Sequence, residues 1–243
     1  MLTLSLTDQS TIRNQILTRL SAEKYPRLFS SLKQVHLDPQ QVLYHAEDDI
    51  RFVYFINHGM ASLLSITAEG DTIEVANVGN EGVLGIPVLL RQVKMPHEVV
   101  VQVPGDAFTI NADVLKQEFE RDGELKDQLL SYTHALATYM SQLSVCNHFH
   151  TLDKRLCRWL LVTSHQVQSQ SFYLTHEALS QVLGTARTGV TMAATKLQKA
   201  GLIRYHRGRI TILDRVRLEV SSCDCYQMTK TVFETLENRD FDR

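Results

Sequence analysis

Residues 174–202 concentrate side chains that can form hydrogen bonds with nucleic acid. Arg187, Thr188 and Thr191 follow a turn-forming glycine, Gly184, at a spacing that places all three on the outward face of a helix, within its first two turns. An arginine there can donate two hydrogen bonds to guanine O6 and N7, and threonine hydroxyls can bond to base edges. The chemistry that this spacing predicts is recognition of bases in the DNA major groove.

The cysteines offer a second kind of chemistry, metal ligation or redox exchange. Cys223 and Cys225 flank Asp224, but a Cys-x-Cys pair needs further ligands, which zinc sites normally take from a second cluster. With Cys146 and Cys157 the chain has four cysteines, and these do not show such spacing. We therefore predict packed or free thiols, with no metal and no cofactor.

The histidines lack the arrangements of known catalytic or metal sites. The chain has no Gly-x-Ser-x-Gly, Gly-x-x-x-x-Gly-Lys or His-Glu-x-x-His motif. His148 and His150 diverge by about 200° on a helix, so they would not chelate one ion together. Nothing selects one of the ten histidines as a haem ligand. We predict that the chain is not an enzyme. Two alternatives stay open: a cupin-like enzyme, although His58 and His97 each stand alone beside turns, and an adaptor that does not bind DNA.

Two short helices must position the basic residues. Leu179, Val182 and Leu183 form the apolar stripe of the first helix, and Gly184 predicts the turn that follows it. Thr185 is the expected N-cap of the second helix. The inner face of that helix is apolar at Val190, Ala193, Ala194 and Leu197.

A short basic hairpin follows the second helix. Residues 202–204 and 209–213 have the pattern of strands, and His-Arg-Gly at 206–208 supplies the turn between them. A helix-turn-helix followed by such a hairpin is a winged DNA-binding unit. The residues that we predict to contact DNA are Thr175, Thr185, Arg187, Thr188, Thr191, Lys196, His206, Arg207 and Arg209.

The charge of the chain separates along its length. The 243 residues carry a net charge of −2. Residues 1–150 hold 11 Lys and Arg against 18 Asp and Glu, a net −7, whereas 151–243 hold 14 against 9, a net +5. Within 151–217 the balance is 11 against 3, a net +8. Because contacts to phosphate supply much of the affinity for DNA, this local excess favours DNA binding over an ordinary solvated helical hairpin.

Residues 41–110 have the pattern of an antiparallel β domain, a sandwich or barrel of the jelly-roll type. The expected turns include Asn57-His58-Gly59 and Pro104-Gly105-Asp106, and Asn111 is expected to cap a helix that ends near residue 120. The expected strands cover 51–56, 61–66, 71–78, 98–103 and 107–110.

Apolar residues at alternating spacings of four and three predict one long helix over 123–150. The pattern lasts three heptads and has the 3.5-residue period of helices that pair along their length. The alternative is a long helix packed on its own β domain. Because a dimeric DNA-binding protein needs such an axis, we predict a homodimer. Its expected contacts are Leu125, Leu129, Tyr132, Leu136, Tyr139 and Leu143, and Cys146 completes the pattern.

The length suits two modest domains, each with its own core. No run approaches 18 consecutive apolar residues and no signal peptide is evident, so we expect a cytosolic chain without membrane contact. The expected fold class is α+β. It comprises an antiparallel β-sandwich sensor domain at 1–122, a dimerisation helix at 123–150 and a winged helix-turn-helix domain at 151–243.

With these parts in this order, the chain resembles the Crp–Fnr family of bacterial transcription regulators. The most specific stretches are LTHEALSQVLGTARTGV at 174–190 and LQKAGLIRYHRGRITIL at 197–213. The β region resembles the family's cyclic-nucleotide-binding-like domain by pattern more than by identity. The resemblance implies an effector-sensing homodimer that binds a near-palindromic operator in double-stranded DNA, with RNA polymerase as a partner if it is an activator.

The chain departs from the family at two places. Ile86 stands where cyclic-nucleotide-binding members carry a ribose-binding Glu, and residues 94–99 offer no Arg-Ser or Arg-Thr pair for the phosphate. We therefore expect no binding of cyclic AMP or cyclic GMP, and the effector and its residues stay unknown. In the second helix, Arg187 matches the family's guanine-reading arginine. Thr188 and Met192 replace the Glu and Arg of the best-known members, so the operator should differ from theirs.

Overall fold

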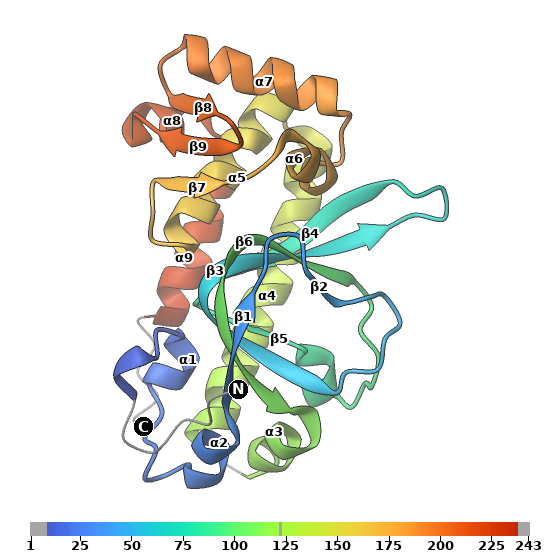
Figure 1. The fold of residues 1–243 in the computed structure, drawn as a ribbon, viewed down its shortest axis with the longest axis vertical. Helices are drawn as coiled ribbons and strands as arrows, with labels where there is room; N and C mark the ends of the chain where they lie inside the picture. The colour runs from blue at the N-terminus through green and yellow to red at the C-terminus, as the bar shows by residue number, and fades with distance from the viewer. Residues whose placement is uncertain (1–8, 122, 238–243) are drawn as a thin grey trace.

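The structure, a computed structural model that describes residues 9–121 and 123–237, joins a rolled antiparallel sheet to a small helical domain through one long helix (Figure 1). The strands are β1 (Lys33–Leu37), β2 (Val42–Tyr44), β3 (Phe52–Ile66), β4 (Thr72–Val78), β5 (Val83–Leu84), β6 (Glu98–Asn111), β7 (Ser171–Tyr173), β8 (Ile203–His206) and β9 (Arg209–Ile212). The α-helices are α1 (Gln15–Thr18), α2 (Pro26–Ser31), α3 (Ala112–Phe119), α4 (Glu124–Phe149), α5 (Leu152–Gln166), α6 (His176–Leu183), α7 (Arg187–Lys199), α8 (Arg215–Ser221) and α9 (Cys225–Glu237). Two 3₁₀ turns, η1 (Gln9–Thr11) and η2 (Ile86–Leu90), complete the set. The expected α+β class is confirmed.

The two longest strands, β3 and β6, organise the roll. The sheet runs β1-β6-β3-β4 with every pair antiparallel, while β2 pairs with β6 and β5 with β3. The pairing of β3 with β6 shifts register three times between Ile56 and Ala61. Such irregularities bend and twist a strand, which lets one strand serve both halves of a roll.

Two turns expected from the sequence are bends within these strands. The segments at 57–59 and 104–106 lie inside β3 and β6 and face each other. A Cβ on Gly59 would lie 2.4 Å from the Val103 carbonyl oxygen, and one on Gly105 would lie 2.1 Å from the His58 oxygen. These glycines therefore permit a close approach of two backbones. In the sequence, a glycine with this role looks the same as a glycine in a turn.

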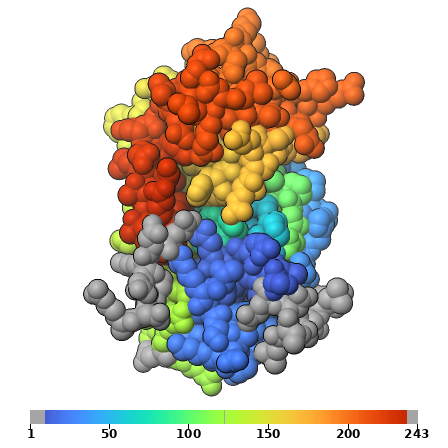
Figure 2. Space-filling view, turned by 90° about the vertical axis from the view of Figure 1, so that its left-hand side faces the viewer, coloured from blue at the N-terminus to red at the C-terminus, as the bar shows by residue number. Residues whose placement is uncertain are grey.

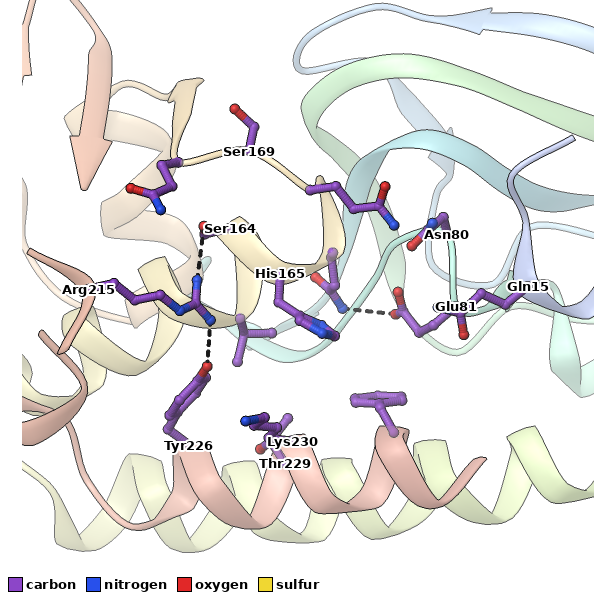
Figure 3. A pocket seen from close by; sticks show the side chains of 15 residues that line it. Gln15, Asn80, Glu81, Ser164, His165, Ser169, Arg215, Tyr226, Thr229 and Lys230 are labelled. Carbon is purple, nitrogen blue, oxygen red and sulfur yellow. Dashed lines mark hydrogen bonds between the residues drawn. The ribbon is translucent and has the colours of Figure 1, made fainter. Parts of the chain in front are cut away.

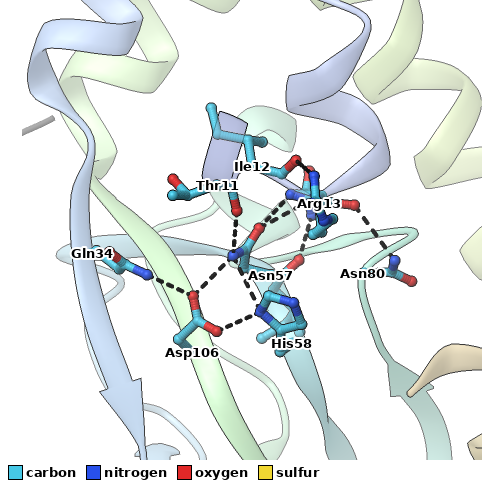
Figure 4. Close-up of polar contacts among 10 residues, drawn as sticks. Thr11, Ile12, Arg13, Gln34, Asn57, His58, Asn80 and Asp106 are labelled. Carbon is cyan, nitrogen blue, oxygen red and sulfur yellow. Dashed lines mark hydrogen bonds and ion pairs between the residues drawn. The ribbon is translucent and has the colours of Figure 1, made fainter. Parts of the chain in front are cut away.

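A polar network ties the N-terminal segment to this bend (Figure 4). The Asn57 side chain accepts a hydrogen bond from the Arg13 backbone N–H at 2.6 Å and donates to Asp106 at 2.9 Å. His58 Nδ1 lies 2.6 Å from the other Asp106 oxygen. From the sequence, His58 was expected to stand alone beside a turn, but its side chain has a partner in the structure. It pairs with a carboxylate that also receives a bond from Gln34.

Helix α4 packs along the roll and α9 packs along α4 (Figure 1). Phe233 of α9 stacks edge-on against Tyr139 of α4, at 5.5 Å between ring centroids. Phe233 and Leu236 belong to the apolar core of the roll. Helix α9, the last helix of the described residues, therefore returns from the helical domain to the sensor side. The expected domain boundaries at 122 and 150 stay predictions.

The helical domain has a second core that continues onto the sheet. Trp159 of α5 is fully buried and lies edge-on to Phe172 of β7 at 6.5 Å. Met60 of β3 and Val100 of β6 belong to the same cluster. None of the helices in the described residues combines the length and the apolar character that a membrane span requires.

Candidate nucleic-acid interface and sensor cavities

The first helix of the motif, α6, is fixed at both ends by its own sequence. Thr175 is the N-cap, and its Oγ1 accepts a hydrogen bond from the Ala178 backbone N–H at 3.1 Å. Gly184 ends the helix with φ 56°, in the left-handed region. A Cβ at this position would lie 3.0 Å from the Ile73 side chain of β4, so glycine suits both the turn and the contact with the sheet.

Helix α7 lies at the end of the molecule that is farthest from the roll (Figure 1), and one of its faces is polar and exposed. Arg187, Thr188 and Thr191 are exposed on it, together with Met192, which is 70 % exposed. Ala186 rather than Thr185 is the N-cap, and no side chain bonds to the first N–H groups there, which corrects the expected role of Thr185. Of the first N–H groups, that of Gly189 bonds to the Ala186 carbonyl at 2.9 Å. A helix start without a side-chain cap can bind an anion through its first N–H groups. The opposite face is buried at Val190, Ala193, Ala194 and Leu197, as expected.

His176, which the sequence did not mark as a site residue, contacts a side chain on the exposed face of α7. The Thr191 hydroxyl donates to the Arg187 carbonyl at 3.0 Å and lies 3.0 Å from His176 Nδ1. The His176 ring stacks on Tyr205 of the wing at 4.4 Å between centroids. Burial and the Arg187 charge lower the pKa of His176, so the neutral ring can donate from Nδ1 to the hydroxyl. The histidine follows the Thr175 cap directly, but only the tertiary contact reveals its role.

The wing is a hairpin with a two-residue turn. In the three-stranded sheet β7-β9-β8, His206 of β8 lies opposite Arg209 of β9. Arg207 and Gly208 form the turn with φ 48° and 79°, which are the positive angles of a type I′ turn. His206, Arg207 and Arg209 are exposed, so the expected hairpin is confirmed and its three basic side chains face solvent.

Lys196 differs from the other predicted contacts because it already has a partner. Its ammonium forms an ion pair with Asp153 at the start of α5. The hydrogen bond from this pair raises the pKa of Lys196. The lysine side chain is exposed, and exposed pairs are weak, so a phosphate can compete for Lys196.

A small apolar cavity of about 210 Å³ lies between the roll and α4. Ile86 lines it, next to Leu84 and Met95 of the roll and Leu136 and Met140 of α4. Among the described residues of its wall, none carries a carboxylate, an ammonium or a guanidinium. His97, which also lines it, has a pKa lowered by burial and an Nδ1 without a partner. A cyclic phosphate would find no compensating cation here.

A larger and more polar cavity, of about 500 Å³, lies where the N-terminal segment, α5 and α9 meet (Figures 2 and 3). Arg215 donates to Tyr226 Oη at 2.8 Å and to Ser164 Oγ at 3.4 Å. On the roll side, Gln166 Nε2 donates to Glu81 at 2.9 Å. A ligand in this cavity would contact both domains.

The domains also meet around one buried carboxyl group, that of Glu74 on β4. Trp159 Nε1 donates to Glu74 Oε2 at 3.0 Å, Asn77 Nδ2 donates to Oε1 at 3.1 Å, and Ser62 Oγ donates to Oε2 at 2.5 Å. Burial raises the pKa of Glu74, and these hydrogen bonds oppose the shift. Because Trp159 lies on α5, the carboxyl group links the sensor sheet to the DNA-binding domain.

The regular apolar pattern on α4 is buried within the chain itself, in the core of the roll up to Leu143 and beside Cys223 and Cys225 at Cys146. Leu125, Leu129, Tyr132, Leu136, Tyr139, Leu143 and Cys146 are each 8 % exposed or less within the single chain. Tyr139 Oη also donates to Asn77 at 3.0 Å. This is the alternative that the sequence left open, a helix packed on its own β domain, and it corrects the expected dimer contacts. The opposite face of α4 is exposed within the single chain.

The geometry defines a class of protein that combines a β-roll domain with a winged helix-turn-helix domain. Comparison with known proteins finds the same two parts. Family models match as a Crp-like helix-turn-helix domain at residues 154–220 and a cyclic nucleotide-binding domain at residues 34–122. The chain belongs to the Crp–Fnr family of transcription regulators.

Individual relatives are distant. A global nitrogen regulator of Synechococcus elongatus is 22% identical over 188 residues, which cover 73% of this chain and 84% of that protein. Its namesake from Nostoc is 21% identical over 187 residues, with the same coverage. Among solved structures, a Crp/Fnr regulator from Eubacterium rectale gives a TM-score of 0.66 at 20% identity and covers 85% of this chain and 96% of that one. FixK2 from Bradyrhizobium japonicum gives 0.68 at 14% identity, with 79% and 98% covered.

Proposed function

We propose that the chain acts in the cytosol as a homodimeric, sequence-specific DNA-binding regulator and catalyses no reaction. The observation that carries this proposal is the exposed polar face of α7, which begins with Arg187 and lies beside a wing with three basic side chains. Helix N-terminal side chains reach base edges while the wing and the helix N–H groups contact phosphates. RNA polymerase is the further partner if the protein activates transcription.

The proposed dimer uses the face of α4 that neither the roll nor α9 covers. Leu130, Ala137, Ser141 and Ser144 are exposed there at spacings of seven, four and three, and Leu130 is 44 % exposed. Small residues at this spacing allow two helices to approach closely. A two-fold axis along α4 would present two α7 helices to two half-sites of one operator.

The proposed effector is not a cyclic nucleotide. The apolar cavity beside Ile86 has no cation for the phosphate and no carboxylate for the ribose among its described lining residues. Calorimetry with cyclic AMP and cyclic GMP should therefore show no binding at physiological concentrations. Micromolar affinity for either nucleotide would contradict this part of the proposal.

Selection of bound duplexes from a random DNA pool tests the proposed function. We expect one enriched motif with two-fold symmetry, whose half-sites lie about 34–36 Å apart, which is one helical turn. A footprint of the purified full chain on the enriched duplex should protect both half-sites. If no sequence is enriched over a scrambled duplex, the adaptor alternative is favoured and the proposal fails.

A further inference from the structure

Four side chains with metal-binding atoms converge where the long helix meets the end of the DNA-binding domain. Cys146 and His150 lie one helical turn apart at the end of α4, and Cys223 and Cys225 lie at the junction of α8 and α9. Their four ligand atoms all lie within 4.8 Å of one another. The Sγ atoms of Cys146 and Cys223 are 3.6 Å apart, and Cys225 Sγ is 3.4 Å from His150 Nδ1.

These distances match the ligand shell of one tetrahedral ion. A zinc ion with Zn–S bonds of about 2.3 Å places its sulfur ligands about 3.8 Å from each other. The cluster is therefore compact enough for a mononuclear site. An iron–sulfur cluster spreads its thiolates over several irons, so it needs a wider set.

The surroundings complete the chemistry of such a site. Asp224 Oδ1 lies 3.5 Å from His150 Nε2, so a carboxylate faces the ring nitrogen that points away from the cysteines. This arrangement is common around zinc-bound histidines, because it fixes the ring and its tautomer. Gln142 Nε2 donates to Cys225 Sγ at 3.0 Å, which favours the thiolate form.

A buried cation balances the charge of the three thiolates. Arg158 of α5 is 2 % exposed, and its Nε and Nη1 atoms have no hydrogen-bond partner. Its charge acts on both Cys146 and Cys223. Three thiolates with one divalent ion leave one negative charge, which the guanidinium offsets.

We propose that Cys146, His150, Cys223 and Cys225 bind one zinc ion that fastens the end of α4 to the start of α9. The three cysteines form a small buried cluster of their own, apart from the two large apolar cores. The expectation of no metal is revised because 77 residues separate Cys146 from Cys223, so no local spacing marks the set. The cluster adjoins the connection between α4 and α5, so the ion would stiffen the joint between sensor and DNA-binding domain.

Metal analysis of the full chain, purified under reducing conditions without chelator, tests the site. We expect one zinc per chain in the wild type and in Cys157→Ala, a matched control because Cys157 is also buried but lies outside the cluster. Cys223→Ala and Cys225→Ala should lose zinc by on the order of tenfold or more. Full zinc retention in both variants, or a metal-free wild type that takes up no added zinc, would overturn the proposal.

A second measurement does not depend on how the variants fold. Metal-free wild type titrated with Co²⁺ should develop thiolate-to-cobalt absorption and the visible bands of a tetrahedral ion, with an endpoint at one equivalent. Spectra without thiolate bands would contradict the assignment. So would iron with acid-labile sulfide, or a mass lower by two hydrogens showing that Cys146 and Cys223 form a disulfide instead.

The effect on DNA binding rests on the proposed function and is measured separately. Removing zinc should weaken binding to the selected duplex, and adding zinc back should restore it. If the chain binds zinc but no DNA, the metal site stands and the proposed function fails. If it binds DNA without ever binding zinc, the reverse holds.

Discussion

In the proposed function, different side chains read bases and anchor phosphates. Arg187 is the first residue of α7 and is exposed. The Thr191 hydroxyl donates to the Arg187 carbonyl and also contacts His176. Arg207 and Arg209 lie on the wing and not on α7, the helix proposed to read bases. The first arginine can therefore be tested for specificity and the others for affinity.

Arg187→Ala should cost roughly 1–3 kcal/mol at the selected operator and relax the preference at one position of each half-site. The reason is the loss of two hydrogen bonds to one guanine, which scrambled DNA does not offer in register. Titrations of both duplexes measure the difference. An equal loss of affinity for operator and scrambled DNA would identify Arg187 as a phosphate anchor.

Substitutions on the wing should lower the affinity for DNA of any sequence by about the same factor. We choose Arg209→Ala and Arg207→Asn, because Arg207 has φ 48° and asparagine tolerates the left-handed region. Each should reduce the slope of log affinity against log salt by about one per lost phosphate contact in each subunit. Titrations at several salt concentrations give the slope, and an unchanged slope with altered specificity would count against phosphate contact.

The stability of the roll should depend on Asp106 at acid pH. Burial raises the pKa of Asp106, but hydrogen bonds from Gln34, Asn57 and His58 outweigh it and lower the pKa overall. A lowered pKa in the folded state means stability that is present above the unfolded pKa and is lost as the pH falls through the folded value. Denaturant midpoints of Asp106→Asn should lack this acid-side loss, whereas Asp71→Asn in an exposed turn should keep it. Parallel curves for wild type and Asp106→Asn would refute the assignment.

At the scale of elements, α4 is one helix with three faces. The apolar heptads face the roll, a second side contacts α9, and the side with Leu130 and Ala137 is open. Charges at Leu129 or Leu136 would therefore disrupt the core of the chain itself, at a cost on the order of kilocalories per mole. They cannot serve as tests of dimer contacts.

The open face of α4 gives the sharper test of dimerisation. Leu130→Asp together with Ala137→Asp places like charges across the proposed axis, and we expect monomers by sedimentation with an unchanged circular dichroism spectrum. Val216→Asp on α8, which replaces a side chain 73 % exposed, is the matched control and should stay dimeric. A double variant that sediments as a dimer would rule out this face.

At the scale of the whole molecule, the two domains are joined by polar groups in otherwise apolar contact. Glu74 receives hydrogen bonds from its own sheet and from Trp159 of the neighbouring domain. Arg158, the residue before Trp159 on α5, supplies a buried positive charge close to the same carboxyl group. The Glu74 carboxyl group therefore connects β4 directly to α5, the first helix of the helical domain.

Trp159→Phe keeps an aromatic ring against Phe172 but removes the donor to Glu74. A buried carboxyl that loses one donor should destabilise the chain by about 1–3 kcal/mol, as measured by denaturant unfolding. Amide exchange in β4 and α5 should rise together if the bond couples the domains. Unchanged exchange in both elements would show that apolar packing alone holds them.

The sequence by itself determined the DNA-binding motif, because its signals are local. The glycine at 184 and the hairpin turn within 206–208 act over a few residues, and the structure confirms both, whereas the expected N-cap at Thr185 was wrong. The Asn111 cap of α3 belongs to the same group, with its Oδ1 accepting from the Asp113 backbone N–H at 2.9 Å. Short-range hydrogen bonds and backbone angles are read directly from residue type.

Only the tertiary structure decided which surface each pattern meets. A heptad stripe states that a helix buries one face, but not whether a sheet or a second helix covers it, and here the sheet does. Gly59 and Gly105 fit a turn or a close approach equally well until β3 and β6 are paired. Cys146 and Cys223 meet across 77 residues because α9 returns along α4. Contacts between distant segments depend on packing, and packing has no signature in local spacing.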